Sequence, residues 1–298
     1  GGFSTTSIRP ELKDIAPFTS YDFRSLQVTQ GNEELRSTTI KNFDVKFEYF
    51  PTAGEIVSFS AYYKNILDPI EKVTGFDNTP AVRPVNTGRA YVRGFEVEFR
   101  KKLDFIKKAS WLSNVQVFGN GSLIQSKVKA GPVNNFFIRS VTEHPLSGQP
   151  NYLINAGLSI LMFKKTFEAT LSYNRSGDFI NQLGTFDEIL LANGKKSPLL
   201  PNLNVKGREL LDLVLTQSFM KEKGKIKFNI SNILKAPFII YQDLNGNKKF
   251  DEAATIEKTS NPTLAHGIFG GVDNTPSYII PQRTFSIAIS YNFSTSKR

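Results

Sequence analysis

The sequence contains no cysteine and only two histidines, His144 and His266. Without a thiol the chain forms no disulfide, holds no metal through sulfur and has no cysteine nucleophile. Two histidines are too few for a metal centre built from several imidazoles. The sequence also lacks an apolar run of about 18 residues, the length that a membrane-spanning helix needs. The fold therefore has to be read from the alternation of apolar and polar residues.

Catalytic motifs are absent from the sequence as well. It has no Gly-x-Ser-x-Gly elbow, no phosphate-binding loop and no zinc-binding His-Glu pattern. The adjacent carboxylates Asp251 and Glu252 are poorly placed for joint acid–base work, because neighbours in a strand point to opposite faces. His144 precedes Pro145 and is expected to be a hydrogen-bonding residue of a loop rather than a ligand. We therefore predict that the chain is not an enzyme.

The chain is basic, with a formal net charge of +10 and a pI near 9.5. Such a balance raises nucleic-acid binding as a hypothesis. The lysines argue against it, because they gather in short segments between apolar stretches. These are Lys101 and Lys102, Lys107 and Lys108, Lys164 and Lys165, and Lys221, Lys223 and Lys225. We favour a rim of turns that face solvent or lipid headgroups.

Residues 283–293 show the apolar alternation most clearly. The large apolar side chains fall on one parity, at Phe285, Ile287, Ile289, Tyr291 and Phe293. Since successive side chains of a strand point to opposite faces, one face is apolar and the other small and polar. The same pattern recurs in eight further segments: 40–50, 55–65, 91–100, 113–124, 152–162, 167–175, 209–219 and 225–232. Most of these strands have the roughly 9–11 residues that cross a bilayer at a tilt.

Charged residues occupy the face opposite the apolar one in two of these segments. They are Asp44, Lys46, Glu48, Glu96, Glu98 and Arg100. Three successive charges would be destabilising in a dry core, whereas a wide and wet lumen accepts them. We therefore expect these six side chains to line a hydrated lumen.

The connections between the predicted strands alternate in length. The short ones are 51–54, 101–112, 163–166 and 220–225, and the long ones are 66–90, 125–151, 176–208 and 233–282. Bacterial membrane barrels have short periplasmic turns and long extracellular loops. The last strand then runs towards the periplasm. Residues 1–37 lack the pattern. We expect a strand stub at 1–8 and then an ordered extracellular loop.

Short phrases along the chain resemble one known family. They include Arg9-Pro10-Glu11-Leu12, Gly31-Asn32-Glu33-Glu34-Leu35, Arg93-Gly94-Phe95-Glu96 and the terminal Tyr291-Asn292-Phe293. In this order they resemble the C-terminal barrel of TonB-dependent outer-membrane receptors, especially those of the Bacteroidota type. The resemblance implies an all-β fold, an antiparallel transmembrane β-barrel of about 22 strands. The chain would supply the C-terminal nine or ten strands over 38–293, followed by a tail at 294–298.

The resemblance also implies a function and a set of partners. The receptor would sit in the outer membrane of a Gram-negative bacterium, capture a scarce nutrient at its extracellular loops and import it with energy from the TonB complex. The partners would be an N-terminal plug with the remaining strands of the same receptor, the membrane lipids and the barrel-assembly machinery, which would read Tyr291 and Phe293. The six charged lumen residues would then contact the plug, unless they are merely hydrated.

Aromatic and basic residues near the long connections are candidates for ligand binding. They are Phe136, Phe137, Arg175, Phe179 and Tyr241. The alternative role is packing that orders the loops. Another candidate site is a calcium loop, because Asp243, Asn245, Asn247 and Asp251 have the spacing of its oxygen ligands. Lys248 and Ala254 depart from the EF-hand pattern at its sixth and twelfth positions, and an asparagine-rich turn is the alternative. No other cofactor is expected.

Two rival functions remain open from the sequence. The first is a soluble β-rich ligand-binding module, which would need one dry and one wet sheet face. The second is an outer-membrane adhesin or pore without TonB coupling. The discriminating observation would be the upstream sequence, since a plug domain and a TonB box there would identify an importer.

Overall fold

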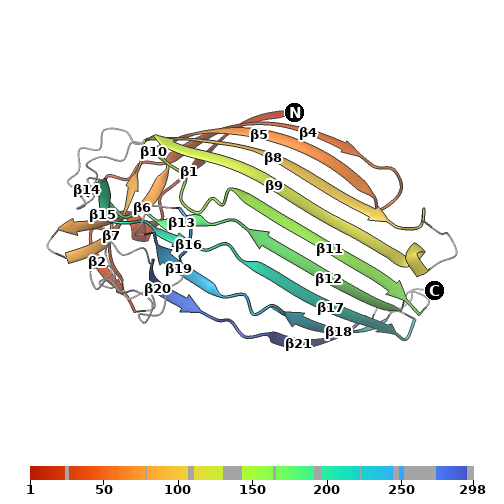
Figure 1. Cartoon of the computed structure of the whole chain (residues 1–298). Coiled ribbons are helices and arrows are strands. Elements are labelled where there is room, and N and C mark those ends of the chain that lie inside the picture. The colour runs from red at the N-terminus through yellow and green to blue at the C-terminus, as the bar shows by residue number, and fades with distance from the viewer. Residues whose placement is uncertain are drawn as a thin grey trace.

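The computed structural model describes residues 1–23, 27–77, 79–106, 111–129, 143–163, 166–190, 196–221, 223–243, 248–251 and 273–293. Its main element is an 11-stranded antiparallel sheet, drawn in Figure 1. Ten strands follow one another across it: β1 (Gly2–Ile8), β4 (Thr38–Tyr49), β5 (Ile56–Leu67), β8 (Arg89–Lys102), β9 (Val115–Lys129), β11 (Tyr152–Met162), β12 (Phe167–Ser176), β17 (Glu209–Phe219), β18 (Gly224–Ser231) and β21 (Thr284–Tyr291). The short β10 (Glu143–His144) pairs with β9 at one side.

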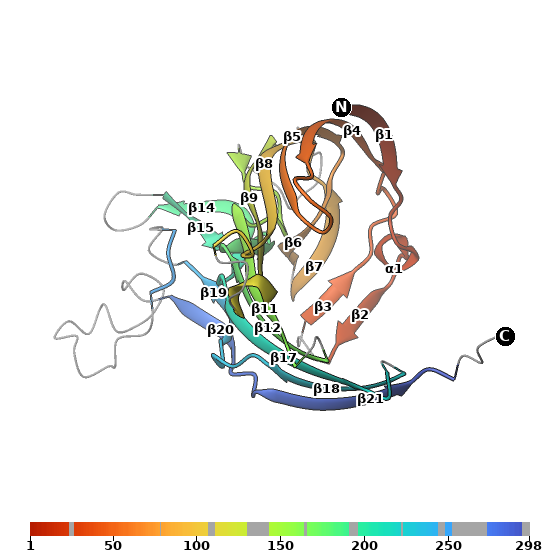
Figure 2. The same cartoon turned by 90° about the vertical axis from the view of Figure 1, so that its right-hand side faces the viewer.

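All nine predicted strands and the predicted stub are present in this sheet. Their order is sequential because each strand pairs with its neighbour through a hairpin or a longer connection. At the edges, β1 pairs with β4 and β21 with β18, and neither has a second partner among the described strands. Figure 2 shows the sheet curling into an arc with one concave side. No helix in the described part of the chain is long and apolar enough to cross a membrane.

The pairing register assigns the two faces of the sheet. Asp44 lies opposite Tyr62, Tyr62 opposite Gly94, and Gly94 opposite Ile124, so one parity forms a continuous inner row. The alternate parity forms the outer face. Its large side chains are highly exposed: Phe47 at 64%, Phe95 at 67%, Leu123 at 68%, Phe285 at 61% and Ile289 at 72%. An apolar face this exposed requires an apolar surrounding, which a bilayer supplies.

The inner face carries an apolar cluster towards the end of the sheet that leads to the long connections. It consists of Ile66, Ala90, Val92, Ile124 and Val128, all at most 9% exposed, with Leu146 and Leu153 packed against it. Leu146 belongs to the segment that follows β10 and lies over the sheet at this point. Ile124 is an inner-face core residue, and the ring of Phe118 fills the space that a side chain at Gly157 would need. Large apolar side chains therefore fall on both faces of β9.

The long connections, which were predicted as extracellular loops, contain three small sheets. One contains β2 (Thr19–Asp22), β3 (Gln27–Gln30), β7 (Thr79–Asn86) and β6 (Ile70–Asp77); the second contains β13 (Phe179–Gln182), β16 (Leu203–Val205), β19 (Phe238–Gln242) and β20 (Asn274–Ile279); the third pairs β14 (Thr185–Leu190) with β15 (Lys196–Leu200). Figure 1 shows them gathered at one end of the long sheet. We call this assembly the head.

The head has its own buried residues, which the barrel pattern did not reveal. Val73, Leu183 and Ile239 are at most 2% exposed. Leu183 joins two of the small sheets, because its amide donates to Lys72 and its carbonyl accepts from Thr74. Two short helical turns complete the described elements, α1 (Leu12–Ile15) in the N-terminal connection and a 3-10 turn at Trp111–Asn114.

Candidate functional site

The six predicted lumen residues lie on the inner face of β4 and β8. The register through β5 places Glu48 and Glu98 opposite the same residue, Ser58, and it places Lys46 and Glu96 opposite Ser60. Lys46 forms an ion pair with Glu48 at 2.7 Å. The Ser60 hydroxyl donates to Glu96 at 3.3 Å. Their shared face is therefore established by the structure, while contact with a plug stays a prediction.

The polar inner surface continues across the next strands. The side-chain amide of Asn155 donates to Asn120 at 2.7 Å, and the amide of Asn174 donates to Asn155. Ser159 donates to Glu168 at 3.0 Å, four residues further along β11. Such ladders keep polar groups satisfied while leaving the surface hydrophilic. The sequence placed these residues on the polar parity, but only the register could bring the three asparagines together.

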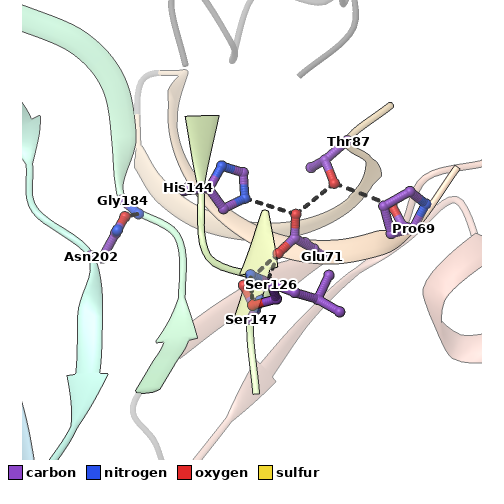
Figure 3. Close-up of polar contacts among 9 residues, drawn as sticks. Pro69, Glu71, Thr87, Ser126, His144, Ser147, Gly184 and Asn202 are labelled. Atoms are coloured by element: carbon purple, nitrogen blue, oxygen red, sulfur yellow. Dashed lines mark hydrogen bonds and ion pairs between the residues drawn. The ribbon is translucent and has the colours of Figure 1, made fainter. Parts of the chain in front are cut away.

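A buried carboxylate joins the head to the barrel wall. The side chain of Glu71, on β6, is 1% exposed and that of His144, on β10, is 6% exposed. The Nε2 atom of His144 lies 2.9 Å from one carboxylate oxygen, and the Thr87 hydroxyl donates to the same oxygen at 2.5 Å. The backbone amide and the hydroxyl of Ser147 donate to the other oxygen at 2.9 and 2.7 Å. Figure 3 shows the carboxylate enclosed by these donors. We call this arrangement the Glu71 clasp.

The electrostatics of the clasp favour an ionised carboxylate. Burial raises the pKa of Glu71, but the hydrogen bond and the charge interaction with His144, helped by Thr87 and Ser147, outweigh it and lower the pKa below its usual value. Because an ionised carboxylate has no hydrogen to give, Nε2 of His144 carries the shared hydrogen. The hydrogen-bonding role predicted for His144 is confirmed, but the residue lies in β10 and not in a loop. Glu71 was missed, because it lies in a segment that was expected to be loop.

Of the predicted ligand residues, Tyr241 is buried in the head at 3% exposure. Its hydroxyl donates to Asp178 at 2.8 Å, and its ring contacts Phe250 edge to face. Burial raises the pKa of Tyr241, and the hydrogen bond to Asp178 raises it further, so the hydroxyl stays a donor. These contacts match the packing role that was the alternative for this residue.

Phe179 lies in the same small sheet as Tyr241, whereas Arg175 has different surroundings. Arg175 is on the outer face, opposite Ile154 and Glu209, where it forms an ion pair with Glu209 at 3.1 Å. Its guanidinium also lies over the ring of Tyr152. Phe179 is half-buried in β13. Phe136 and Phe137 lie outside the described residues.

The predicted calcium loop is described only in part, because Asn245 and Asn247 fall outside the described residues. One carboxylate oxygen of Asp243 accepts the amide of Lys248 at 2.7 Å. The amide of Asp251 donates to Asp273 at 2.8 Å. Among the described residues, no group of three or more acidic, histidine or cysteine side chains could hold a metal. Calcium binding stays a prediction.

The predicted assembly signal lies at the open edge of the sheet. Tyr291 is the last residue of β21 and pairs with Gly224, and its ring meets Phe293 edge to face at 4.8 Å. Phe293 is 83% exposed. Both rings are therefore accessible in the folded chain, as a recognition signal requires.

Comparison with known proteins assigns a family to this arrangement of strands. The family model described as "Outer membrane protein beta-barrel family" matches residues 2–264. The chain belongs to this outer-membrane β-barrel family. The outer face therefore meets the bilayer of an outer membrane, in agreement with the sequence prediction. A search of curated proteins finds no match.

Solved structures show the same fold in larger proteins. The ferric enterobactin receptor PfeA of Pseudomonas aeruginosa matches with a TM-score of 0.54 at 14% identity, over 98% of this chain and 37% of that chain. The siderophore receptor PirA of Acinetobacter baumannii matches with a TM-score of 0.52 at 15% identity, over 98% and 38%. The chain thus spans less than two fifths of either receptor's length. At these identities the similarity is one of fold.

Proposed function

We propose that this chain is part of an outer-membrane active-transport receptor, which takes up a scarce nutrient with energy supplied through TonB. The observation that carries the proposal is the match of nearly the whole chain to a minor part of two receptors, one named for ferric enterobactin and the other for a siderophore. On this proposal the chain supplies barrel wall and extracellular head, and does so without enzymatic activity. The plug and the remaining strands of the same receptor are its partners.

The open edges of the sheet support a place within a larger barrel. A membrane barrel leaves no strand edge unpaired in lipid, since every backbone polar group there needs a partner. Strands β1 and β21 each have one partner among the described strands, and the sheet between them is an arc. Strands from elsewhere in the receptor would close it.

The inner face supports a plugged or solvated lumen. It is polar over much of its length and becomes apolar next to the head, where Leu146 covers Ile124 and Val128. The charged residues Glu96 and Glu98 face the same side. A soluble sandwich would place its apolar face inside and its polar face in water, which is the reverse of what the exposed rings of the outer face require.

The head supports ligand capture at the extracellular side. It is built from connections that leave the barrel at one end, and the Glu71 clasp with its buried neighbours fixes part of it to the wall. Loops held by such a scaffold are the usual carriers of binding residues. We infer that the nutrient binds at the head before it passes the plug.

Energy-dependent uptake by the full-length receptor tests the proposal. Cells with and without the receptor gene are supplied with radiolabelled ferric siderophores, cobalamin or oligosaccharides, with and without a protonophore. We expect one class to accumulate only when the receptor is present and the proton gradient is intact. Receptor-dependent passage that persists with the protonophore would instead indicate a pore, and no receptor-dependent accumulation of any class would count against import.

A further inference from the structure

The outer face carries a patch of positive charge where β8 and β9 approach the head. The patch contains five cations: Lys41, Arg89, Arg93, Lys127 and Lys129. The register places Lys41 and Lys127 in one row with Tyr91, and Arg89 directly opposite Lys129. All five residues are exposed. Among the described residues, a single carboxylate lies in the patch, that of Glu143, which pairs with Lys127 at 2.5 Å.

The two arginines of the patch are held by neutral partners. Both Nε and a terminal nitrogen of Arg93 donate to the amide oxygen of Gln125, at 2.8 and 2.6 Å. A terminal nitrogen of Arg89 approaches the Tyr91 hydroxyl at 3.5 Å. Neither guanidinium forms a salt bridge with a carboxylate in the described part of the chain. Since a guanidinium has five N–H donors, each arginine retains donors that these contacts do not use.

Other outer-face cations of the sheet are neutralised. Lys101, at the opposite end of β8, pairs with the buried Glu55 at 2.8 Å. Arg175, on β12, pairs with Glu209. Uncompensated positive charge is therefore a local property of the β8–β9 corner rather than a general feature of the outer face. It calls for an anionic partner that comes from outside the chain.

The position of the patch along the strands shows which part of the membrane the anionic partner occupies. Directly below Arg93 on β8, the outer face continues with Phe95, Val97 and Phe99, which are 67%, 42% and 42% exposed. These residues belong to the apolar band that lies in lipid. Tyr63 and Tyr91, with ring centroids 6.2 Å apart, mark the upper border of the band. Cations at this border lie at the level of lipid headgroups.

We propose that the patch binds the phosphate groups of an acylated, phosphorylated glycolipid in the outer leaflet. Arg89 and Arg93 lie four residues apart on one strand, about 14 Å along it, so they can hold two separate phosphates or two neighbouring lipids. A hollow of about 930 Å³ reaches Arg93 and Gln125 and also touches Phe95 and Leu123. Acyl chains then lie against the apolar band while the phosphates contact the cations.

This inference uses the outer-membrane location of the chain and not its transport activity. It is tested on the purified full-length receptor by native mass spectrometry in a mild detergent. The probes are a diphosphorylated acylated glucosamine disaccharide (lipid A), the same lipid without phosphates, and inorganic phosphate as a competitor. We expect the phosphorylated lipid to bind best and to resist millimolar inorganic phosphate, because the acyl chains add affinity that the free ion lacks.

Substitutions distinguish the patch from general charge effects. Arg93→Gln should weaken binding of the phosphorylated lipid about fivefold. The double variant, with Arg89→Gln and Arg93→Gln, should weaken it by about that factor for each charge that is removed. Lys64→Gln is the matched control, since Lys64 lies on the inner face at the same level, opposite Val92. Heat-dependent mobility in gels shows whether each variant is folded. If the double variant does not fold, binding of the phosphorylated lipid is measured on Arg93→Lys in its place. Equal binding of the phosphate-free lipid, or equal loss in Lys64→Gln, would overturn the proposal, as would full displacement by inorganic phosphate.

Discussion

The Nε2 atom of His144 lies 2.9 Å from the carboxylate of Glu71, and the two side chains are 6% and 1% exposed. They are separated by 73 positions in the sequence and belong to different sheets, since β10 borders the barrel wall and β6 belongs to the head. The contact therefore fixes the head relative to the wall. Because the contact includes a titratable carboxylate, its strength depends on pH.

Acid should release the Glu71 clasp. The pKa of Glu71 is lowered in the fold, so its contribution to stability is present above the unfolded value of about 4.5 and is lost as the pH falls through the lowered folded value. We expect the protection of β6 and β10 against hydrogen exchange in the full-length receptor, measured relative to the intrinsic exchange rate at each pH, to fall as the pH drops below about 4.5, with little change between pH 5 and 7.

Glu71→Gln should remove this pH dependence and loosen the head at neutral pH. The amide offers one acceptor oxygen in place of two, so donors from Thr87, His144 or Ser147 lose a partner, at a cost of about 1–3 kcal/mol. Glu143→Gln is the control, because Glu143 is adjacent to His144 but exposed, and its ion pair with Lys127 should contribute at most about 1 kcal/mol. Equal effects of the two variants would show that the clasp does not fix the head.

The two faces of β17 predict opposite responses to arginine. Leu213 is on the outer face, between Leu171 and Ile230, whereas Thr216 is on the inner face, opposite Glu168 and Lys227. Leu213→Arg should destabilise the barrel by about 2–4 kcal/mol near the bilayer midplane, while Thr216→Arg should be tolerated. Urea titration of the receptor in lipid vesicles measures both. Similar losses in the two variants would contradict the assigned faces.

The barrel wall could be predicted from the sequence because its strands are long and obey one rule. In β4, Phe43 and Phe47 alternate with Asp44 and Glu48 over a full membrane crossing, so parity alone identifies both faces. The hairpin pairing of such strands then follows from their order along the chain. The stub at Gly2–Ile8 was predicted as well, although its sequence lacks this alternation.

The head could not be predicted in this way because its strands are short and are buried by partners distant in sequence. Val73 of β6 is buried beside Leu183, 110 positions later, and Ile239 lies in a third segment. No periodicity within one segment reports such contacts. The Glu71 clasp was missed for the same reason, since an isolated glutamate in a long connection looks like a solvated residue until the segment carrying His144 is placed against it.

The charged inner face predicts an effect on the plug. Glu96→Lys would place a second cation near Lys46 and remove the acceptor for Ser60. If the plug docks against this surface, the variant should weaken docking by roughly 0.2–1 kcal/mol for each exposed pair that is lost, and protease should reach the plug faster. Glu143→Lys, the same charge change outside the lumen, is the control. Unchanged plug protection and uptake in Glu96→Lys would leave these residues merely hydrated.

The segment around Asp243 predicts calcium binding by the head. Asp243 and Asp251 both lie in described residues and supply hard oxygen ligands at the spacing of a calcium loop. We expect isothermal titration of the full-length receptor to show calcium binding with a dissociation constant of about 0.1–1 mM, the range of extracellular modules. Asp243→Ala should abolish the heat signal, whereas Asp104→Ala, in the turn at the opposite end of the barrel, should not. A signal that survives Asp243→Ala would place the ion elsewhere, and a receptor that binds no calcium at millimolar concentration would reduce the segment to an asparagine-rich turn held by the contact between Asp243 and Lys248.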